Sequence, residues 1–244
     1  MTSKLLQPIK SGSLRSQVFQ EIRTAIFSGK FRPGNPLREL QLARDLQVSQ
    51  ATVREALLRL ENLGLVIRVE NRETIVTQLS SQEIRERIAI RIPLESLAAI
   101  EASRRMTKSH FEVLNQRLRD ISRVIDSNSY FETAQADLEF HRYIWEQSGN
   151  RMLHRMLDQL TAPLFAFISI MRSNTVENLK AAVRSHKPIV NALKEGAPEL
   201  IQREIQHHIN TSYGEFLHAD AEELPVSASL SEAKSRQEHS GFPR

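Results

Sequence analysis

The chain has 244 residues, enough for two domains of ordinary size, and 40% of them are hydrophobic. It contains no cysteine, which excludes disulfide bonds and thiolate metal sites and fits a reducing cytoplasm. No apolar run approaches the roughly 18–20 residues that span a bilayer, and the first residues lack the apolar core of a signal peptide. We therefore expect a cytoplasmic protein that does not contact a membrane.

The basic residues are concentrated in the N-terminal third of the chain. Residues 1–79 carry 12 Lys or Arg and 7 Asp or Glu, a net charge of +5. The rest of the chain has 21 basic and 22 acidic residues, a net charge of −1. A basic module is what neutralisation of DNA phosphates requires. Because many solvated domains carry a similar excess, the charge supports a DNA-binding module without establishing it.

Two short amphipathic helices joined by a tight turn are predicted in LRELQLARDLQVSQATVREALLRLENLGLV, residues 37–66. Gln47 and Val48 form the turn, and Ser49 can cap the second helix by accepting a hydrogen bond from a later backbone N–H. The positions at helical spacing are expected to be buried: Leu42, Ala43, Leu46, Val53, Ala56, Leu57 and Leu60. A helix carried across another in this way can enter the major groove of DNA. The alternative is a helical hairpin with a solvated, charged outer face.

The segments on either side of this hairpin favour the DNA-binding interpretation. Apolar residues recur every fourth position over Leu14–Ile26, which predicts a helix with Ser13 as its N-cap. Gly64 ends the second hairpin helix, and two β-prone runs follow at residues 65–69 and 74–77. Three helices and a two-stranded wing make a winged helix-turn-helix domain. The residues assigned to DNA contact are Arg38, Ser49, Gln50, Ala51, Thr52, Arg54, Arg59 and Arg72.

The remainder of the chain is predicted to be an all-helical bundle, so the fold class is mainly α. Pro93 is expected to kink the first bundle helix, and Ser109 to cap the second. The helices are expected at residues 83–102, 109–127, 130–148, 151–173, 177–194 and 198–217. The predicted segments are a flexible arm at 1–12, the winged domain at 13–79, a linker at 80–82, the helical effector, metal-binding and dimerisation domain at 83–218, and a disordered tail at 219–244.

Four residues of the bundle could form a metal site. Asp137 and His141 are four residues apart, so they share one helix face with Cβ atoms about 5–6 Å apart. His186 and His208 lie on two successive helices and can meet across the core if those helices run antiparallel. One carboxylate and three imidazoles suit Zn²⁺ or another borderline divalent metal, with positions left for water or a ligand. Bundle cores commonly build metal sites from facing helices.

Each of these residues also has a simpler interpretation. An Asp and a His at this spacing more often form a surface hydrogen bond, and His186 stands where it could simply begin a helix. His207 and His208 are adjacent, so only one of them can face the core, and spacing alone does not choose between them. The residues by themselves therefore leave the metal site open.

The sequence resembles the GntR family of bacterial transcription regulators. The resemblance is carried by RTAIFSGKFRPGNPLREL and LARDLQVSQATVREALLRLENLGLV in the N-terminal part. The Asp137/His141 pair, the turn Ser148-Gly149-Asn150, and His186 followed 22 residues later by His208 are similar to the FadR-type subfamily, which has an FCD effector domain. The resemblance implies that Asp137, His141, His186 and His208 coordinate a metal, with zinc expected first and nickel as the other candidate.

The resemblance also implies how such a protein works. A homodimer would bind a palindromic double-stranded DNA operator, and a small organic acid bound beside the metal would alter the operator affinity. Arg91 matches an arginine of the family's pattern, and its guanidinium could pair bidentately with an effector carboxylate. A salt bridge from Arg91 to a neighbouring Glu is the alternative. Asn150 is the second residue assigned to the effector.

The chain departs from the family's pattern at two places that face DNA. Gln50, Ala51 and Thr52 stand where relatives usually have Arg and then Thr or Pro, and a Gln amide reads adenine whereas an arginine favours guanine. Glu73 stands where a glycine is usual at the wing tip, and a carboxylate there repels phosphate. The operator is therefore expected to differ from the family's usual one, and minor-groove contact by the wing is left open.

We predict a metabolite-responsive transcription regulator, a repressor rather than an enzyme. A metal-dependent hydrolase is the rival interpretation, because Asp and three His with an open position could activate water. Against it, no motif places a general base, and an enzyme has no use for a DNA-binding module. A third interpretation is a DNA-binding protein whose effector site is vestigial.

Overall fold

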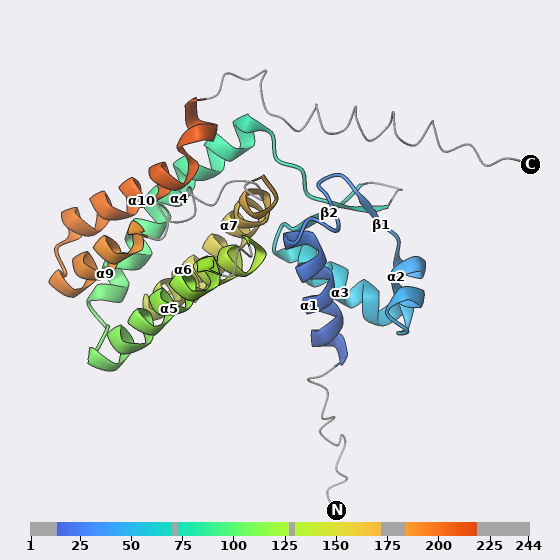
Figure 1. Cartoon of the computed structure of the whole chain (residues 1–244), viewed down its shortest axis with the longest axis horizontal. Coiled ribbons are helices and arrows are strands. Elements are labelled where there is room, and N and C mark those ends of the chain that lie inside the picture. The colour runs from blue at the N-terminus through green and yellow to red at the C-terminus, as the bar shows by residue number, and fades with distance from the viewer. Residues whose placement is uncertain (1–13, 70–72, 127–129, 172–183, 219–244) are drawn as a thin grey trace, which may run out of the picture.

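The structure is a computed structural model, and it describes residues 14–69, 73–126, 130–171 and 184–218. Figure 1 shows a small N-terminal head, with helices and short strands, beside a larger bundle of helices. The predicted fold class, a winged helix-turn-helix followed by an all-helical bundle, is confirmed. Predictions that fall outside the described residues are the arm at 1–12, the N-cap Ser13, Arg72 in the turn at 70–72, the start of the helix expected at 177–194, and the tail at 219–244.

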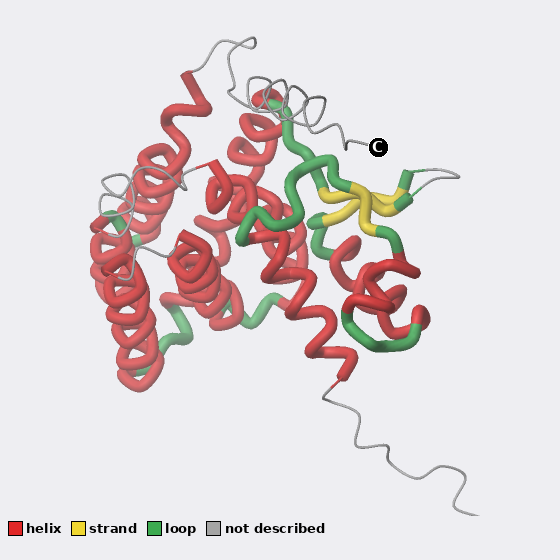
Figure 2. Tube along the Cα trace, turned by 45° about the vertical axis from the view of Figure 1, so that its right-hand side comes forward, coloured by secondary structure: helices red, strands yellow, loops and turns green. Residues whose placement is uncertain are grey.

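The head is built around a three-helix core and a small sheet. Its elements are α1 (Leu14–Phe27), β1 (Pro36–Leu37), α2 (Glu39–Asp45), α3 (Gln50–Asn62), β2 (Val66–Arg68) and β3 (Thr74–Val76). The strands form an antiparallel sheet in the order β1-β3-β2, drawn in yellow in Figure 2. The sequence did not predict β1, because it is only two residues long and Pro36 cannot donate to a ladder. This segment is a strand because it pairs with β3.

The helices of the head pack as their apolar spacing predicted. Val53, Ala56, Leu57 and Leu60 of α3 are all buried, as are Val18, Ile22 and Ile26 of α1. Leu14 was expected on the same face but is 51% exposed, because it lies at the very start of α1. The side chain of Ser49 caps α3 by accepting a hydrogen bond of 3.2 Å from the backbone N–H of Thr52. This cap fixes where the second hairpin helix begins.

Gly64 ends α3 and turns the chain into the wing. Its φ is +69°, and its N–H donates to the carbonyl of Glu61, while the N–H of Leu65 reaches back to the carbonyl of Leu60. These two bonds satisfy carbonyls that the helix end leaves without an intrahelical partner. A Cβ on Gly64 would also lie 3.2 Å from the ring of Pro163 in the bundle. Gly64 therefore serves both the turn and the junction with the bundle.

Substitution of Gly64 by alanine is expected to destabilise the protein by about 1–2 kcal/mol, because an L side chain in the left-handed region costs roughly that much. The close Pro163 ring adds to this cost. The urea unfolding midpoint measures the effect. Gly214→Ala is the matched control: Gly214 lies within a helix, and a Cβ there meets nothing within 4 Å. The control should stabilise by up to about 1 kcal/mol. Equal shifts of the same sign in both variants would contradict this account of Gly64.

The bundle holds most of the helical residues that the structure describes. Its helices are α4 (Ser81–Ser103), α5 (Lys108–Asp126), α6 (Tyr130–Gln147), α7 (Arg151–Met171), α9 (His186–Glu195) and α10 (Pro198–His218). Helix α4 continues through Pro93. A short turn joins α9 to α10, and Gly196 adopts a φ of +76° there. Extensive packing of α10 on α4 and of α6 on α7 makes one continuous core.

Two helix starts differ from the sequence expectation. Helix α4 begins at Ser81, because Ser80 and Glu83 form a capping box in which each side chain accepts from the other residue's backbone N–H. The residues expected as a linker therefore hold the cap and first turn of α4. Helix α5 begins at Lys108, so Ser109 lies in its first turn and is not its N-cap.

The head packs directly on helix α7 of the bundle. The hydroxyl of Ser169 donates a hydrogen bond of 2.8 Å to the backbone carbonyl of Phe27, and both residues are buried. Gly64 lies against Pro163 one to two turns earlier on α7. Helix α1 also contacts α7. The two parts of the chain therefore share a packed junction, through which a change in the bundle can reach the head.

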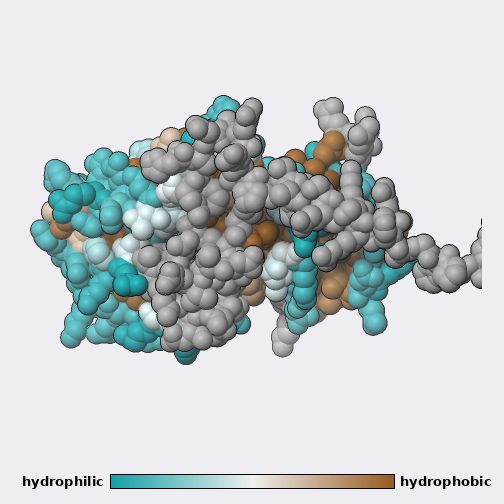
Figure 3. Space-filling model, turned by 45° about the horizontal axis from the view of Figure 1, so that its top comes forward, coloured by the Kyte–Doolittle hydropathy of each residue, from teal (hydrophilic) through white to brown (hydrophobic). Residues whose placement is uncertain are grey.

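On the face shown in Figure 3, hydrophilic residues cover much of the described part of the bundle, with smaller hydrophobic patches between them. Among the helices that the structure describes, none is long and apolar enough to cross a bilayer.

Candidate metal centre and nucleic-acid interface

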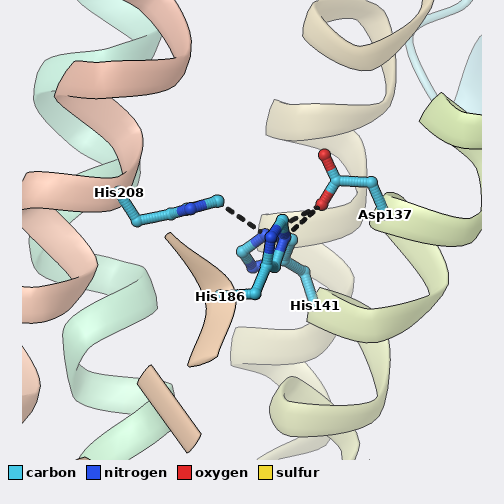
Figure 4. Close-up of side chains that lie close together, drawn as sticks. All are labelled: Asp137, His141, His186 and His208. Carbon is cyan, nitrogen blue, oxygen red and sulfur yellow. Dashed lines mark hydrogen bonds and ion pairs between the residues drawn. The ribbon is translucent and has the colours of Figure 1, made fainter. Parts of the chain in front are cut away.

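Asp137, His141, His186 and His208 come together in the core of the bundle (Figure 4). One ligand atom from each lies within 4.8 Å of the ligand atoms of the other three. The Nε2 atom of His186 is 2.7 Å from Oδ1 of Asp137, and Nε2 of His141 is 3.3 Å from the same oxygen. The Nε2 atoms of His141 and His208 are 3.0 Å apart. The structure thus brings together all four residues that the sequence singled out.

Three helices supply these side chains. Asp137 and His141 project from one face of α6, one turn apart. His186 is the first residue of α9, and His208 lies on α10, which the turn at Gly196 folds back against α9. His208 is 2% exposed, whereas His207 is exposed. Packing therefore makes the choice between the two adjacent histidines that spacing left open.

The arrangement fits a divalent metal ion. Two ligand atoms on an ion with bonds of about 2.0–2.1 Å lie about 2.9 Å apart at octahedral angles and about 3.3 Å apart at tetrahedral angles. The separations of 2.7, 3.0 and 3.3 Å between these atoms are close to both values. The three histidines are fully or almost fully buried, and each turns Nε2 toward Asp137 or toward another histidine of the set. Imidazole nitrogens and one carboxylate are ligands that zinc and nickel accept. These four residues could hold such an ion.

A second layer of contacts orients the histidine rings. Glu95 of α4 is in ion-pair contact with Nδ1 of His141, and Nδ1 of His208 is 2.7 Å from the hydroxyl of Ser185. Because Nδ1 of these two rings is engaged in this way, Nε2 is the nitrogen left to face the common centre. Metal-binding histidines typically have such partners on their other nitrogen. Sequence reasoning missed Glu95 and Ser185, although Glu95 stands four residues after Arg91.

Burial and neighbouring charges shift the pKa values of Glu95, His141 and His208 in different directions. Burial alone would raise the pKa of Glu95, but the charges of Arg91 and His141 outweigh it and hold that pKa well below its usual value. Burial would lower the pKa of His141, yet Glu95 and Asp137 raise it above the ordinary value. Burial and the neighbouring His186 lower the pKa of His208. His208 is therefore held as the neutral imidazole that a metal requires.

Glu95→Gln is expected to weaken metal affinity by about 10–100-fold, the usual effect of removing an outer partner of a histidine ligand. The amide keeps the volume but loses the negative charge that orients and supports His141. Competition with a fluorescent chelator measures the affinity. Glu101→Gln on the same helix is the matched control, because Glu101 pairs with Arg104 at the surface. Unchanged affinity in Glu95→Gln would contradict the orienting role.

The two residues assigned to the effector are placed differently. Arg91 is buried and donates from Nε to Glu95 at 2.7 Å and from Nη1 to the Tyr213 hydroxyl at 3.2 Å. The salt bridge considered as the alternative is thus present, but Nη2 of Arg91 has no hydrogen-bond partner among the described residues. Asn150 is exposed and caps α7 by accepting from the backbone N–H of Leu153 at 3.0 Å. Its role is that of a helix cap, and we do not assign it to the effector.

The outer face of α3 carries the residues predicted to read DNA. Gln50 and Arg54 both donate to Glu39 of α2: Gln50 at 2.9 Å, and Arg54 through Nη2 at 2.7 Å and Nε at 3.1 Å. Ala51 is exposed beside them, and Thr52 hydrogen-bonds the capping Ser49. The Glu39 carboxylate therefore holds Gln50 and Arg54 together on one face of the hairpin.

The surface hollow between the hairpin and the wing is lined by more arginines than carboxylates. Arg38 donates to Glu73 at 2.7 Å, so the acidic residue expected to repel phosphate is paired with a neighbouring arginine. Arg44 and Arg68 line the same surface hollow, and sequence reasoning missed both. Their position inside the basic N-terminal module was the sequence feature that could have indicated them as DNA-contacting candidates. Arg72 lies outside the described residues.

Arg59 does not belong to this surface. Its guanidinium stacks on the ring of Phe19 at 4.1 Å, on the side of α3 that faces α1 and the bundle. Nine residues of α-helix turn by about 900°, which puts Arg59 about half a turn away from Gln50. Its assignment to DNA contact is therefore corrected, and the helical period was enough to predict this.

Comparisons with known proteins agree with the fold. The family model of bacterial regulatory proteins of the gntR family matches residues 14–76, and that of the FCD domain matches residues 86–211. A protein named probable D-xylose utilization operon transcriptional repressor, from Paenarthrobacter nicotinovorans, is 32% identical over 81% of this chain and 86% of that protein. The HTH-type transcriptional repressor RspR of Escherichia coli K12 is 24% identical over 80% of this chain and 86% of that protein.

Solved structures give the same fold. The structure of E. coli McbR/YncC superposes with a TM-score of 0.74 at 21% identity, covering 84% of this chain and 97% of that one. A putative GntR transcriptional regulator from Rhodococcus sp. RHA1 gives a TM-score of 0.69, also at 21% identity, over 84% and 98% of the two chains. The two family models, together with relatives named as transcriptional repressors, show a DNA-binding transcription regulator. The chain belongs to the GntR family of bacterial regulatory proteins and carries an FCD domain.

Proposed function

We infer that this protein is a repressor whose affinity for its operator depends on a divalent metal and a small organic acid bound in the helical domain. Zinc is the metal proposed first and nickel the second. The observation that carries the proposal is the convergence of four ligand atoms within 4.8 Å in a buried core. The protein would act in the cytoplasm as a homodimer on a palindromic operator.

The effector is proposed to bind beside the metal. Four protein ligands leave an octahedral ion with positions for a carboxylate or water, which is the arrangement that a small acid needs. The free Nη2 of Arg91 offers a charge-assisted donor to that acid, in the same core. Because a similar protein is named as a probable repressor of a D-xylose utilization operon, sugar acids are the first class to examine.

Coupling to DNA would follow from the packed junction between bundle and head. An effector that binds one arrangement of the two heads in the dimer more tightly shifts the population toward it, and only by the difference in affinity. Ser169, Pro163 and their partners in the head connect α7 to α1 and to the end of α3. Through these contacts, the effector would change the position of the head and leave the outer surface of α3 unchanged.

The test combines a thermal-shift screen with operator binding. The metal-loaded protein should show a raised melting temperature with at least one sugar or organic acid, and the metal-free protein should not. The same acid should change affinity for an operator fragment selected from random-sequence DNA by the wild-type protein. Operator binding that is indifferent to metal and to every acid would overturn the sensor and leave a regulator with a vestigial site.

A further inference from the structure

A cleft lies between the head and the bundle, away from both the metal centre and the outer face of α3. It has a volume of about 750 Å³, and its walls come from α1 and α3 on one side and from α6 and α7 on the other. None of the four metal-site residues lines it. Its charged lining residues are Arg23, Arg59, Glu139, Arg142, Arg155 and Asp158.

The two carboxylates of the cleft are already engaged. Arg142 donates a hydrogen bond to Asp158 at 2.6 Å and another to Glu139 at 2.7 Å. Both carboxylates are therefore paired with the same arginine. Arg59 stacks on Phe19, and within the described part of the chain neither Arg59 nor Arg155 forms an ion pair. The cleft therefore holds more positive than negative charge.

Arg23 is the buried member of this group. It is only 8% exposed, and its Nη1 donates to the side chain of Gln20 at 3.2 Å. Its Nη2 lies 4.0 Å from Glu139 and has no hydrogen-bond partner among the described residues. Burial, followed by the nearby charge of Arg142, lowers the pKa of Arg23. A buried guanidinium donor without an acceptor is costly, and an anion in the cleft would relieve that cost.

We propose that this cleft binds a phosphate group, as inorganic phosphate or as a phosphate monoester, through Arg23, Arg59 and Arg155. Guanidinium groups match phosphate oxygens in geometry and charge, and a phosphate dianion supplies the acceptors that Arg23 lacks. Arg23 and Arg59 belong to the head, and Arg155 belongs to the bundle. A phosphate held by all three stabilises the present arrangement of the two parts.

The experiment measures the affinity of the full-length protein for inorganic phosphate by calorimetry and thermal shift at constant ionic strength. Wild-type protein should gain about 3 °C in melting temperature at phosphate well above Kd. Arg155→Gln and Arg59→Gln should each weaken phosphate affinity about tenfold or more. Both side chains are exposed, so these variants should fold even if a variant of the buried Arg23 does not. Arg151→Gln, on the same helix as Arg155 but outside the cleft, should bind as wild type.

Two further variants separate this cleft from the other anion-attracting surfaces. Arg54→Gln and His186→Ala should keep the phosphate response, because they alter the α3 face and the metal centre only. Loss of the response in either of them, with the two cleft variants unaffected, overturns the proposal, as does the absence of any response in the wild type. Tighter binding of glucose 6-phosphate than of inorganic phosphate would identify a monoester as the ligand, and equal binding would identify phosphate itself.

Discussion

Purified His208→Ala is expected to bind metal at least about a hundredfold more weakly than the wild type, because losing a ligand exceeds the 10–100-fold effect of losing an outer partner. His208 is buried, its Nε2 lies 3.0 Å from that of His141, and its lowered pKa keeps it ready to coordinate. Its removal would leave two imidazoles and one carboxylate in the core. After dialysis, elemental analysis of wild type grown with zinc and nickel should find about one metal ion per chain, and the variant almost none.

The neighbouring histidine provides a closely matched control. His207 is exposed on the same helix, so His207→Ala removes the same atoms one residue away and should keep its metal. His186→Ala should behave like His208→Ala. The melting temperatures of the metal-free proteins show whether the loss of metal is a secondary effect of unfolding. A His208→Ala protein that retains metal contradicts the assignment of the centre, and a wild type that never contains metal points to a vestigial site.

Arg54→Ala is expected to weaken binding to the selected operator by about 1–3 kcal/mol, while leaving metal content intact. Arg54 is about half exposed on the outer face of α3, beside Gln50, and Glu39 holds its guanidinium in a fixed direction. If Arg54 contacts a base edge, the variant should lose discrimination at one position of the operator. If it contacts a phosphate, the slope of log affinity against log salt concentration should become shallower by about one.

Fluorescence anisotropy titrations at several salt concentrations measure both quantities. Arg104→Ala is a suitable control, because Arg104 is also an exposed arginine paired with a glutamate but lies in the bundle. It should bind the operator as the wild type does. Arg54→Ala with unchanged affinity and unchanged salt dependence would remove Arg54 from the DNA interface. Arg59→Ala should have a smaller effect than Arg54→Ala, since Arg59 faces Phe19 and not the outer surface.

Much of the head could be predicted because its signals are local. The apolar spacing of α3, the capping hydroxyl of Ser49 and the glycine at position 64 act within one or two helical turns, and the structure has all three. The pairing of Asp137 with His141 is local in the same sense, because four residues bring any two side chains to one helix face. The family resemblance added His186 and His208, which spacing alone could not select.

The parts that escaped prediction depend on contacts between remote segments. Strand β1 exists because β3 pairs with it, and Glu95 reaches His141 only because α4 packs on α6. The cap formed by Asn150 is different, because it is a local contact with Leu153 at the predicted start of the next helix.

The sequence by itself determined the class of this protein, since helical periodicity, helix caps and the basic N-terminal module follow from the order of residues along the chain. Only the tertiary structure decided that His208 and not His207 faces the core, that Arg59 stacks on Phe19, and that Arg23 lies buried at the junction. The physical reason is that burial and charge pairing depend on which helices pack together. That packing is set by side chains far apart in the sequence.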